Sequence, residues 1–196
     1  DSAAGVVLAA ENVSVVEADA MRVDWDELLQ GSDRWVLVAN LPYNVATPLV
    51  CDLLDGVPSV ARMLVMVQRE VAERFCAPAR SDAYGAVSVK IAYWATARIA
   101  GHVPATVFVP KPNVESSLAE ITRRATPATT ADREAMFSLV RTSFGQRRKM
   151  LRRSLAGTVA PEVFEAAGIE ATRRPEELDV MEWGRLTDAW TAGRTA

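Results

Sequence analysis

Short apolar runs alternate with helical patterns along the N-terminal third of this chain. The runs are typical of buried parallel strands, and they are VSVVEA (13–18), RWVLVA (34–39) and ARMLVMV (61–67). Apolar residues at helical spacing mark the segments between and after them, namely 25–29, 46–55 and 68–76. Strands and helices in this order require right-handed crossovers, so the sequence predicts a doubly wound α/β sheet. Ligands of such sheets bind at the carboxyl ends of strands, where Asp19 and Asn40 stand.

The middle of the chain predicts further sheet structure. Residues 84–95 fit a helix or a strand equally well, because their apolar spacing suits both. Residues 96–124 predict a strand, a proline-rich loop and a second strand. Pro104, Pro110 and Pro112 exclude a helix from that loop and should make it stiff.

The C-terminal part predicts a small helical domain. The linker-like ATPATT (125–130) precedes an amphipathic helix that Thr130 would cap. Further helices are predicted at 148–156, 161–167 and 181–192. We therefore expect two domains, residues 1–125 and residues 126–196.

Charge is spread unevenly over the chain. The net charge of −3 and the pI near 5.3 by themselves disfavour a nucleic-acid partner. The stretch RTSFGQRRKMLRR (141–153), however, holds six basic residues and no acidic one. We expect this stretch to form a helix with a locally positive face, and the plain alternative is that its basic side chains are merely solvated.

Composition excludes several classes of protein. Cys51 and Cys76 have neither metal-ligand nor disulfide spacing, so we expect buried thiols and no metal. No run approaches the roughly 18 apolar residues of a spanning helix. The N-terminal sequence lacks the basic lead and cleavage pattern of a signal peptide. We expect a cytoplasmic protein with no membrane contact.

The letters NLPY follow the second strand-like run without any turn residue between them. Pro42 fixes its own φ and pushes Leu41 out of the α region, so this corner should be extended and rigid. The Asn40 side-chain oxygen and the Leu41 carbonyl could then accept both hydrogens of an adenine amine and turn its lone pair towards a methyl group. Tyr43 would offer its ring for stacking. No proton must leave before attack, so no base is required, and the only histidine, His102, is expected to be structural. An ordinary turn after a strand is the alternative.

Three segments, in this order, resemble the small-subunit ribosomal RNA adenine dimethyltransferases of the KsgA (RsmA) type. They are NLPYNVATPLV (40–50), VFVPKPNVESSL (107–118) and FGQRRKMLRRSL (144–155). The similarity runs from about Asn12 to Leu186. It implies a Rossmann-like class I methyltransferase sheet, lacking its first strands, followed by a small all-helical domain.

The resemblance also implies a role for each candidate residue. The target amine would be oriented by Asn40, Leu41, Pro42 and Tyr43. Phe108 would line the base pocket, so that Tyr43 and Phe108 sandwich a flipped adenine. S-adenosylmethionine would be contacted by Asp19, Ala20 and Asn40. RNA phosphates would be bound by Arg147, Arg148, Lys149, Arg152 and Arg153. Two alternatives stay open: Phe108 could be a core residue, and Asp19 could merely cap the segment that follows it.

As a member of that family, the chain would carry part of an rRNA adenine N6,N6-dimethyltransferase. S-adenosylmethionine would be the methyl donor, without a metal, and two adjacent adenosines near the 3′ end of 16S rRNA would be the target during small-subunit biogenesis. Residues 1–125 would form a partial methyltransferase domain and residues 126–196 a helical RNA-binding domain. The partner would be small-subunit rRNA or the immature small subunit, and we expect a monomer.

One expected part is missing from the sequence. A methyl-donor site of this class begins with a strand, a glycine-rich loop and an acidic second-strand end, and the sequence shows none of them. We interpret the chain as a fragment that by itself binds S-adenosylmethionine poorly and is inactive; a natural short relative that binds RNA without catalysis is the alternative. The motifs are also compatible with a 23S rRNA adenine methyltransferase of the macrolide-resistance type, a DNA adenine methyltransferase, or a non-catalytic rRNA-binding assembly factor.

Overall fold

A computed structural model describes residues 12–195 and divides the chain into two compact units, residues 1–31 and residues 32–196. In the first unit, helix α2 (Trp25–Leu28) is capped by Asp24, whose carboxylate accepts a hydrogen bond from the Glu27 backbone N–H at 3.0 Å. The predicted strand at 13–18 is wrong, since this segment has no strand structure and its valines are exposed. A strand needs a partner for its backbone groups, and no described residue pairs with this segment.

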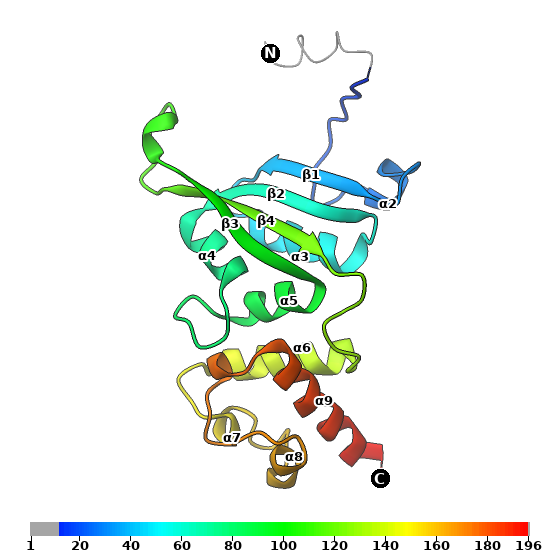
Figure 1. The fold of residues 1–196 in the computed structure, drawn as a ribbon, viewed down its shortest axis with the longest axis vertical. Coiled ribbons are helices and arrows are strands. Elements are labelled where there is room, and N and C mark those ends of the chain that lie inside the picture. Colours follow the sequence, from blue (N-terminus) through cyan, green and yellow to red (C-terminus); the bar gives the residue numbers. More distant parts are fainter. Residues whose placement is uncertain (1–11, 196) are drawn as a thin grey trace. The chain divides into compact units, whose positions relative to one another are not determined.

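The second unit contains one four-stranded sheet (Figure 1). Its strands are β1 (Trp35–Asn40), β2 (Val60–Gln68), β3 (Ala95–Val103) and β4 (Ser116–Arg123), in the spatial order β1-β2-β4-β3. β1 pairs parallel with β2, whereas β4 runs antiparallel to both of its neighbours. The strands predicted at 34–39 and 61–67, and the strand, loop and strand after them, are confirmed. Because β4 is antiparallel, its first residues lie at the same edge as the carboxyl ends of β1 and β2.

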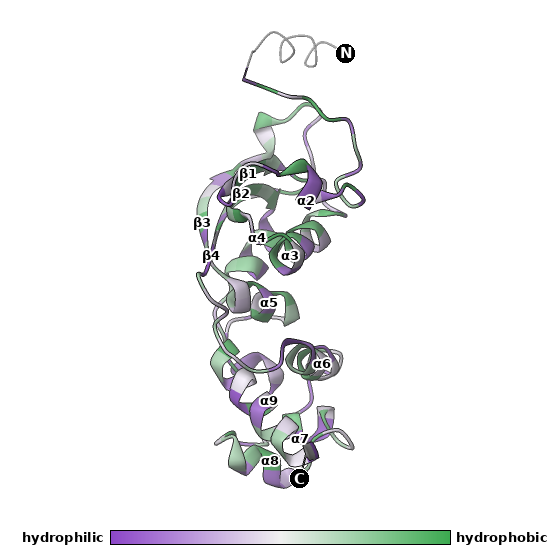
Figure 2. Cartoon of the chain, turned by 90° about the vertical axis from the view of Figure 1, so that its right-hand side faces the viewer, coloured by the Kyte–Doolittle hydropathy of each residue, from purple (hydrophilic) through white to green (hydrophobic). Residues whose placement is uncertain are grey.

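The helices between the strands cover one face of the sheet. They are α3 (Ala46–Gly56), α4 (Arg69–Cys76) and α5 (Ala86–Trp94). Figure 2 shows the sheet with these helices to one side of it. Among residues 32–195, helices therefore cover only one face, and the second helical layer of a doubly wound sheet is not part of these residues. On the uncovered face, the Val36 and Val38 side chains are 58% and 72% exposed.

The ambiguous segment 84–95 is mostly helix. Helix α5 begins after Gly85, whose backbone N–H donates to the Ser88 hydroxyl at 3.0 Å, and it ends where Ala95 becomes extended and starts β3. Both Val89 and Ile91 are buried, on different sides of the helix. A helix that is apolar on several faces has no clear period, which explains why its sequence fitted two structures.

The C-terminal part of the second unit is helical. Its elements are α6 (Arg133–Phe144), α7 (Leu151–Ser154), α8 (Pro161–Ala166), the 3-10 turn η2 (Pro175–Glu177) and α9 (Val180–Thr195). The predicted Thr130 cap is wrong, because the Asp132 carboxylate accepts from the Ala135 N–H at 2.7 Å and begins α6. The helix predicted at 148–156 is only the short α7.

The core of these helices includes residues that precede the linker. Tyr84, Val89 and Tyr93 pack into the same buried cluster as Leu139 and Trp183. The Tyr84 hydroxyl also donates to the Leu178 carbonyl at 2.9 Å. The sheet and the C-terminal helices thus belong to one compact unit, and a domain boundary between 125 and 126 stays a prediction.

None of the described helices is both long enough and apolar enough to cross a membrane.

Candidate functional site

The corner at the end of β1 is held by backbone hydrogen bonds on both sides. The Leu41 N–H donates to the Met66 carbonyl at 3.1 Å and so extends the pairing with β2. The Pro42 carbonyl accepts from the N–H groups of Val45 and Ala46, both at 3.1 Å, and leads the chain into α3. Leu41 itself is buried. The corner is therefore rigid, as its proline predicts.

A second segment reaches the same edge of the sheet. The connection between β3 and β4 contains the 3-10 turn η1 (Ala105–Val107), followed by Phe108 in an extended conformation and a cis Val109–Pro110 bond. Figure 1 shows this connection projecting beyond the strand ends. Phe108 is half-buried, so it is not simply a core residue.

The corner and the connection enclose a pocket of about 480 Å³. Its lining residues are Asn40, Leu41, Pro42, Tyr43, Phe108, Val109, Pro110, Pro112 and Ser116. The structure thus brings together the five residues predicted for amine and base binding, although their roles stay predictions. Sequence reasoning assigned no role to Val109, Pro110, Pro112 or Ser116. The prolines after Phe108 were the sequence signal for these residues, because they hold the backbone extended and so keep the neighbours of Phe108 at the pocket.

The pocket has hydrogen-bond acceptors but no strong acid or base. Among residues 12–195, nothing donates to the Asn40 side-chain oxygen or to the Leu41 carbonyl, so both can accept from a ligand. The lining contains no carboxylate, imidazole, thiol or amine. His102 does not line it, because this residue lies on β3 with its Nδ1 3.0 Å from the Ser117 hydroxyl. Such a pocket can orient a planar amine, and Tyr43 is the one ionisable side chain among its described lining residues.

An ion-pair cluster lies beside this edge. The Arg69 guanidinium donates to Glu73 at 2.8 Å and to Glu115 at 3.0 Å, and these bonds raise its pKa above the ordinary value. Since Glu115 directly precedes Ser116, one wall of the pocket is fixed to the start of α4. The Arg69 charge is neutralised by its partners and is not available as a phosphate site.

The other two cofactor candidates lie in the first unit. Asp19 follows no strand, and its carboxylate caps the next turn by accepting from the Met21 N–H at 2.9 Å. Asp19 also forms an exposed ion pair with Arg22 at 3.5 Å. The Ala20 carbonyl accepts from the Trp25 indole N–H at 3.1 Å. The alternative that Asp19 caps the segment after it is therefore confirmed, and a contact between Asp19 and the cofactor stays a prediction.

The basic stretch does not form the predicted basic helix. Arg147, Arg148 and Lys149 lie in a run of turns after α6, and only Arg152 and Arg153 lie on α7. All five side chains are exposed. A pocket of about 420 Å³ is lined by the turn itself, residues 144–149. Gly145 at the end of α6 disfavours a longer helix, and a continuous helix would place Arg148 beside Arg152 and Lys149 beside Arg153, where like charges repel.

One of these cations is already engaged. The Arg147 guanidinium donates to the Asp82 carbonyl at 2.7 Å and so ties the turn to the loop before α5. Within residues 12–195, the other four cations form no ion pair or side-chain hydrogen bond. Arg148, Lys149, Arg152 and Arg153 are thus available to bind an anionic partner, whereas Arg147 has a structural contact.

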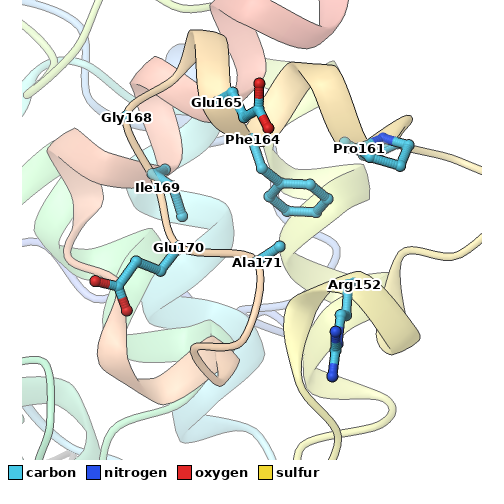
Figure 3. Close-up of a pocket in the computed structure, with 9 residues that line it drawn as sticks. Arg152, Pro161, Phe164, Glu165, Gly168, Ile169, Glu170 and Ala171 are labelled. Atoms are coloured by element: carbon cyan, nitrogen blue, oxygen red, sulfur yellow. The ribbon is translucent and has the colours of Figure 1, made fainter.

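A larger cavity of about 620 Å³ lies among the C-terminal helices (Figure 3). Its apolar lining includes Phe164 and Ile169, which are buried. Arg152 borders it, but so do the carboxylates Glu165 and Glu170. The two negative charges disfavour a phosphate there, so this cavity does not extend the basic surface.

Comparisons with known proteins give the family. The family model described as "Ribosomal RNA adenine dimethylase" matches residues 4–191. A protein of Kineococcus radiotolerans named ribosomal RNA small subunit methyltransferase A is 48% identical over 177 residues, which are 88% of this chain and 58% of that protein. A protein of the same name from Acidothermus cellulolyticus is 44% identical, over 92% of this chain and 62% of that protein. The chain thus spans about three-fifths of the length of these relatives.

Solved structures show the same fold. A dimethyladenosine transferase from Plasmodium falciparum superposes with a TM-score of 0.79 at 19% identity, covering 97% of this chain and 77% of that one. The 23S rRNA methyltransferase ErmE gives 0.69 at 20% identity with the same coverage. These likenesses confirm the predicted Rossmann-like methyltransferase sheet with a helical part after it. With the family match covering nearly the whole sequence, the chain belongs to the ribosomal RNA adenine dimethylase family.

Proposed function

We propose that this chain carries the target-base half of an rRNA adenine N6,N6-dimethyltransferase that acts on small-subunit rRNA. The observation that carries the proposal is the pocket where Asn40, the Leu41 carbonyl, Tyr43 and Phe108 meet. Two acceptors without a donor among residues 12–195 and two aromatic rings match the amine and the faces of one adenine.

The chemistry requires orientation rather than proton removal. An adenine amine is a weak nucleophile because its lone pair is delocalised into the ring. Donation of its two hydrogens to Asn40 Oδ1 and the Leu41 carbonyl oxygen would turn the lone pair out of the ring plane. Tyr43 and Phe108 would hold the base by stacking, and the proton would leave to water after methyl transfer. The described lining residues include no carboxylate, imidazole or amine, which is consistent with this order.

The methyl donor we propose is S-adenosylmethionine, which supplies an activated methyl group and needs no metal. Asp19 and Ala20 fit its adenine ring as a donor and acceptor pair. One Asp19 carboxylate oxygen is used by the Met21 N–H, and the other has only an exposed ion pair. The Ala20 N–H has no hydrogen-bond partner among residues 12–195. Asn40, in the second unit, is the remaining residue that we propose for cofactor contact.

RNA binding would use the unpaired cations of the C-terminal part, residues 126–196. Changing Arg148 and Lys149 together to Ala should reduce the slope of log affinity against log salt by about 1.4, at about 0.7 per phosphate contact for single-stranded RNA. The matched control is Arg62→Ala with Arg98→Ala, which removes two charges that pair with Glu120 on the sheet. An equal fall in slope for both double variants would contradict a local phosphate site.

The specific target we propose is the pair of adjacent adenosines near the 3′ end of 16S rRNA, within the immature small subunit, with the protein acting as a cytoplasmic monomer. The relatives' names support the small subunit. A 23S rRNA target is the second enzyme candidate, favoured only by the structural likeness to ErmE. Primer extension across both RNAs after methylation would separate the two.

The decisive experiment compares catalysis with binding. The chain is joined behind the N-terminal part of the Kineococcus radiotolerans relative that it does not match, and transfer of labelled methyl groups to immature small subunits is measured. Asn40→Ala should lower turnover about 100-fold, as loss of one preorganised contact does in other enzymes, and leave RNA affinity within about twofold, since phosphate contacts provide most of it. Binding without any methylation by the unchanged fusion would instead indicate a non-catalytic assembly factor.

A further inference from the structure

The connection between β3 and β4 exposes an apolar tip beside the pocket. Val109 is 100% exposed and yet lines the pocket, next to Phe108. Val107 and Val114 of the same connection are 60% and 40% exposed. Lys111 is the only charged residue between Val103 and Val114. Apolar side chains gathered on a projecting loop indicate a surface that is covered in a complex.

In the proposed function, a base can enter the pocket only after it has been unstacked from its neighbours in the RNA strand. The acceptors Asn40 and Leu41 lie at the end of a strand, and Tyr43 and Phe108 line the same pocket. In the proposed function these two rings would take the two faces of the base, so a base could not enter while its neighbours cover those faces. Extrusion leaves a gap in the nucleic-acid strand, and proteins that unstack bases commonly fill such a gap with an apolar side chain. The filling group must stand beside the pocket, be free of protein contacts and be held stiffly.

Val109 meets these three requirements. It is on the pocket rim and it is fully exposed. Pro110 and Pro112 follow it closely, and proline limits the movement of the backbone on which it stands. Val107 is exposed too, but it does not line the pocket. The two valines therefore form a matched pair that differs in position relative to the pocket.

We propose that Val109 is a positioning residue that inserts into the RNA stack in the place of the target adenine and so keeps that base in the pocket. This inference rests on the proposed function, because it needs an adenine in RNA as the ligand. It adds a residue that touches the neighbours of the target base rather than the base. Lys111 would lie near the backbone of the same strand and bind a phosphate.

The test uses the full chain and an RNA hairpin that carries the two adjacent adenosines. One of them is replaced by 8-vinyladenosine, a fluorescent adenine that keeps its 6-amino group and brightens when it is unstacked. At saturating protein, Val109→Ser should reduce the fluorescence gain about fivefold or more, because the apolar group that fills the gap is lost. Val109→Leu should retain the gain, and Val107→Ser should stay within about twofold of the unchanged chain. Circular dichroism melting checks that the variants remain folded.

A second RNA separates insertion from a general loss of affinity. It carries the fluorescent adenosine in a single-nucleotide bulge, where no stack must be opened, and Val109→Ser should match the unchanged chain on it. An equal loss for Val107→Ser and Val109→Ser on the hairpin, or no loss for Val109→Ser, would overturn the wedge while leaving the base pocket intact. Binding of the hairpin by the unchanged chain with no fluorescence gain would overturn both the wedge and the proposed base capture.

Discussion

Arg123, the last residue of β4, donates four hydrogen bonds to carbonyls, three at the end of α3 and one at the start of β2. Its Nε donates to Val60 at 2.9 Å, and its Nη1 donates to Leu54 at 2.9 Å. Its Nη2 donates to Leu53 at 2.9 Å and to Val57 at 3.0 Å. We predict that Arg123→Met, which keeps much of the side-chain volume, strongly destabilises the second unit.

The size of the effect follows from the carbonyls that are left behind. The carbonyls of Leu53 and Val57 each keep a backbone donor, so they lose one hydrogen bond without being left unsatisfied. In a regular helix the Leu54 carbonyl would accept a hydrogen bond from the N–H of residue 58. Pro58 has no N–H, so the Arg123 guanidinium is the donor instead. Burial lowers the pKa of Arg123, and this desolvation cost offsets part of the gain. Counting about 1 kcal/mol for each of four bonds, less that cost, gives a loss of about 2–4 kcal/mol.

Urea unfolding followed by tryptophan fluorescence would measure this loss. At an m-value of about 2 kcal/mol/M, the midpoint should fall by about 1–2 M with the slope unchanged. The control is Arg124→Met, because the exposed Arg124 donates a single bond to the Ala92 carbonyl at 3.1 Å and should cost about 0.5–1 kcal/mol. Equal midpoints for the two variants would contradict the role assigned to Arg123 and indicate that water satisfies the α3 carbonyls.

Three further predictions concern the rest of the molecule. The Arg173 hydrogen bonds lower the pKa of Glu182 below its usual 4.5. The pair therefore stabilises the fold above about pH 4.5, and its contribution disappears as the pH falls through the lowered pKa. Glu182→Gln should cost about 1–3 kcal/mol of unfolding free energy in urea at pH 7 and much less at pH 3. A Cβ at Gly184 would lie 2.3 Å from the Thr129 hydroxyl oxygen and 2.8 Å from its Cβ, so Gly184→Ala should cost about 1–3 kcal/mol, and the combination with Thr129→Gly should cost less than the sum of the two single changes. Burial raises the pKa of Cys51 to about 11, so at pH 8 its reaction with an aromatic disulfide should be roughly a hundredfold slower than in the urea-unfolded chain, and an equal rate would show that the thiol is open to solvent.

The features that could be predicted from the sequence are those that depend on local residue pattern. Two apolar strands, the helices after them and the rigid Asn40 corner depend on residue period and on one proline, and all are present. The strand at 13–18 failed because strand formation depends on a partner, which an apolar run does not supply by itself. The prediction of a basic helix was wrong because it did not weigh Gly145 or the repulsion between cations four residues apart.

The candidate site could be predicted only as separate segments. The proline-rich connection and the corner are 60 or more residues apart in sequence, and it is the antiparallel placement of β4 beside β2 that brings them to one edge. No periodicity reveals that order. The structural tie of Arg147 to the Asp82 carbonyl was equally hidden, because a backbone acceptor leaves no trace in the sequence.

The packing of α5 bears on how the chain would respond to a protease. The segment 125–130 has the composition of a cleavable linker, but Tyr84, Val89 and Tyr93 anchor the C-terminal helices from the other side of it. A single cut there would break the covalent connection and leave the buried cluster in place. The two pieces should therefore migrate as one particle in native gel filtration and separate only in denaturant.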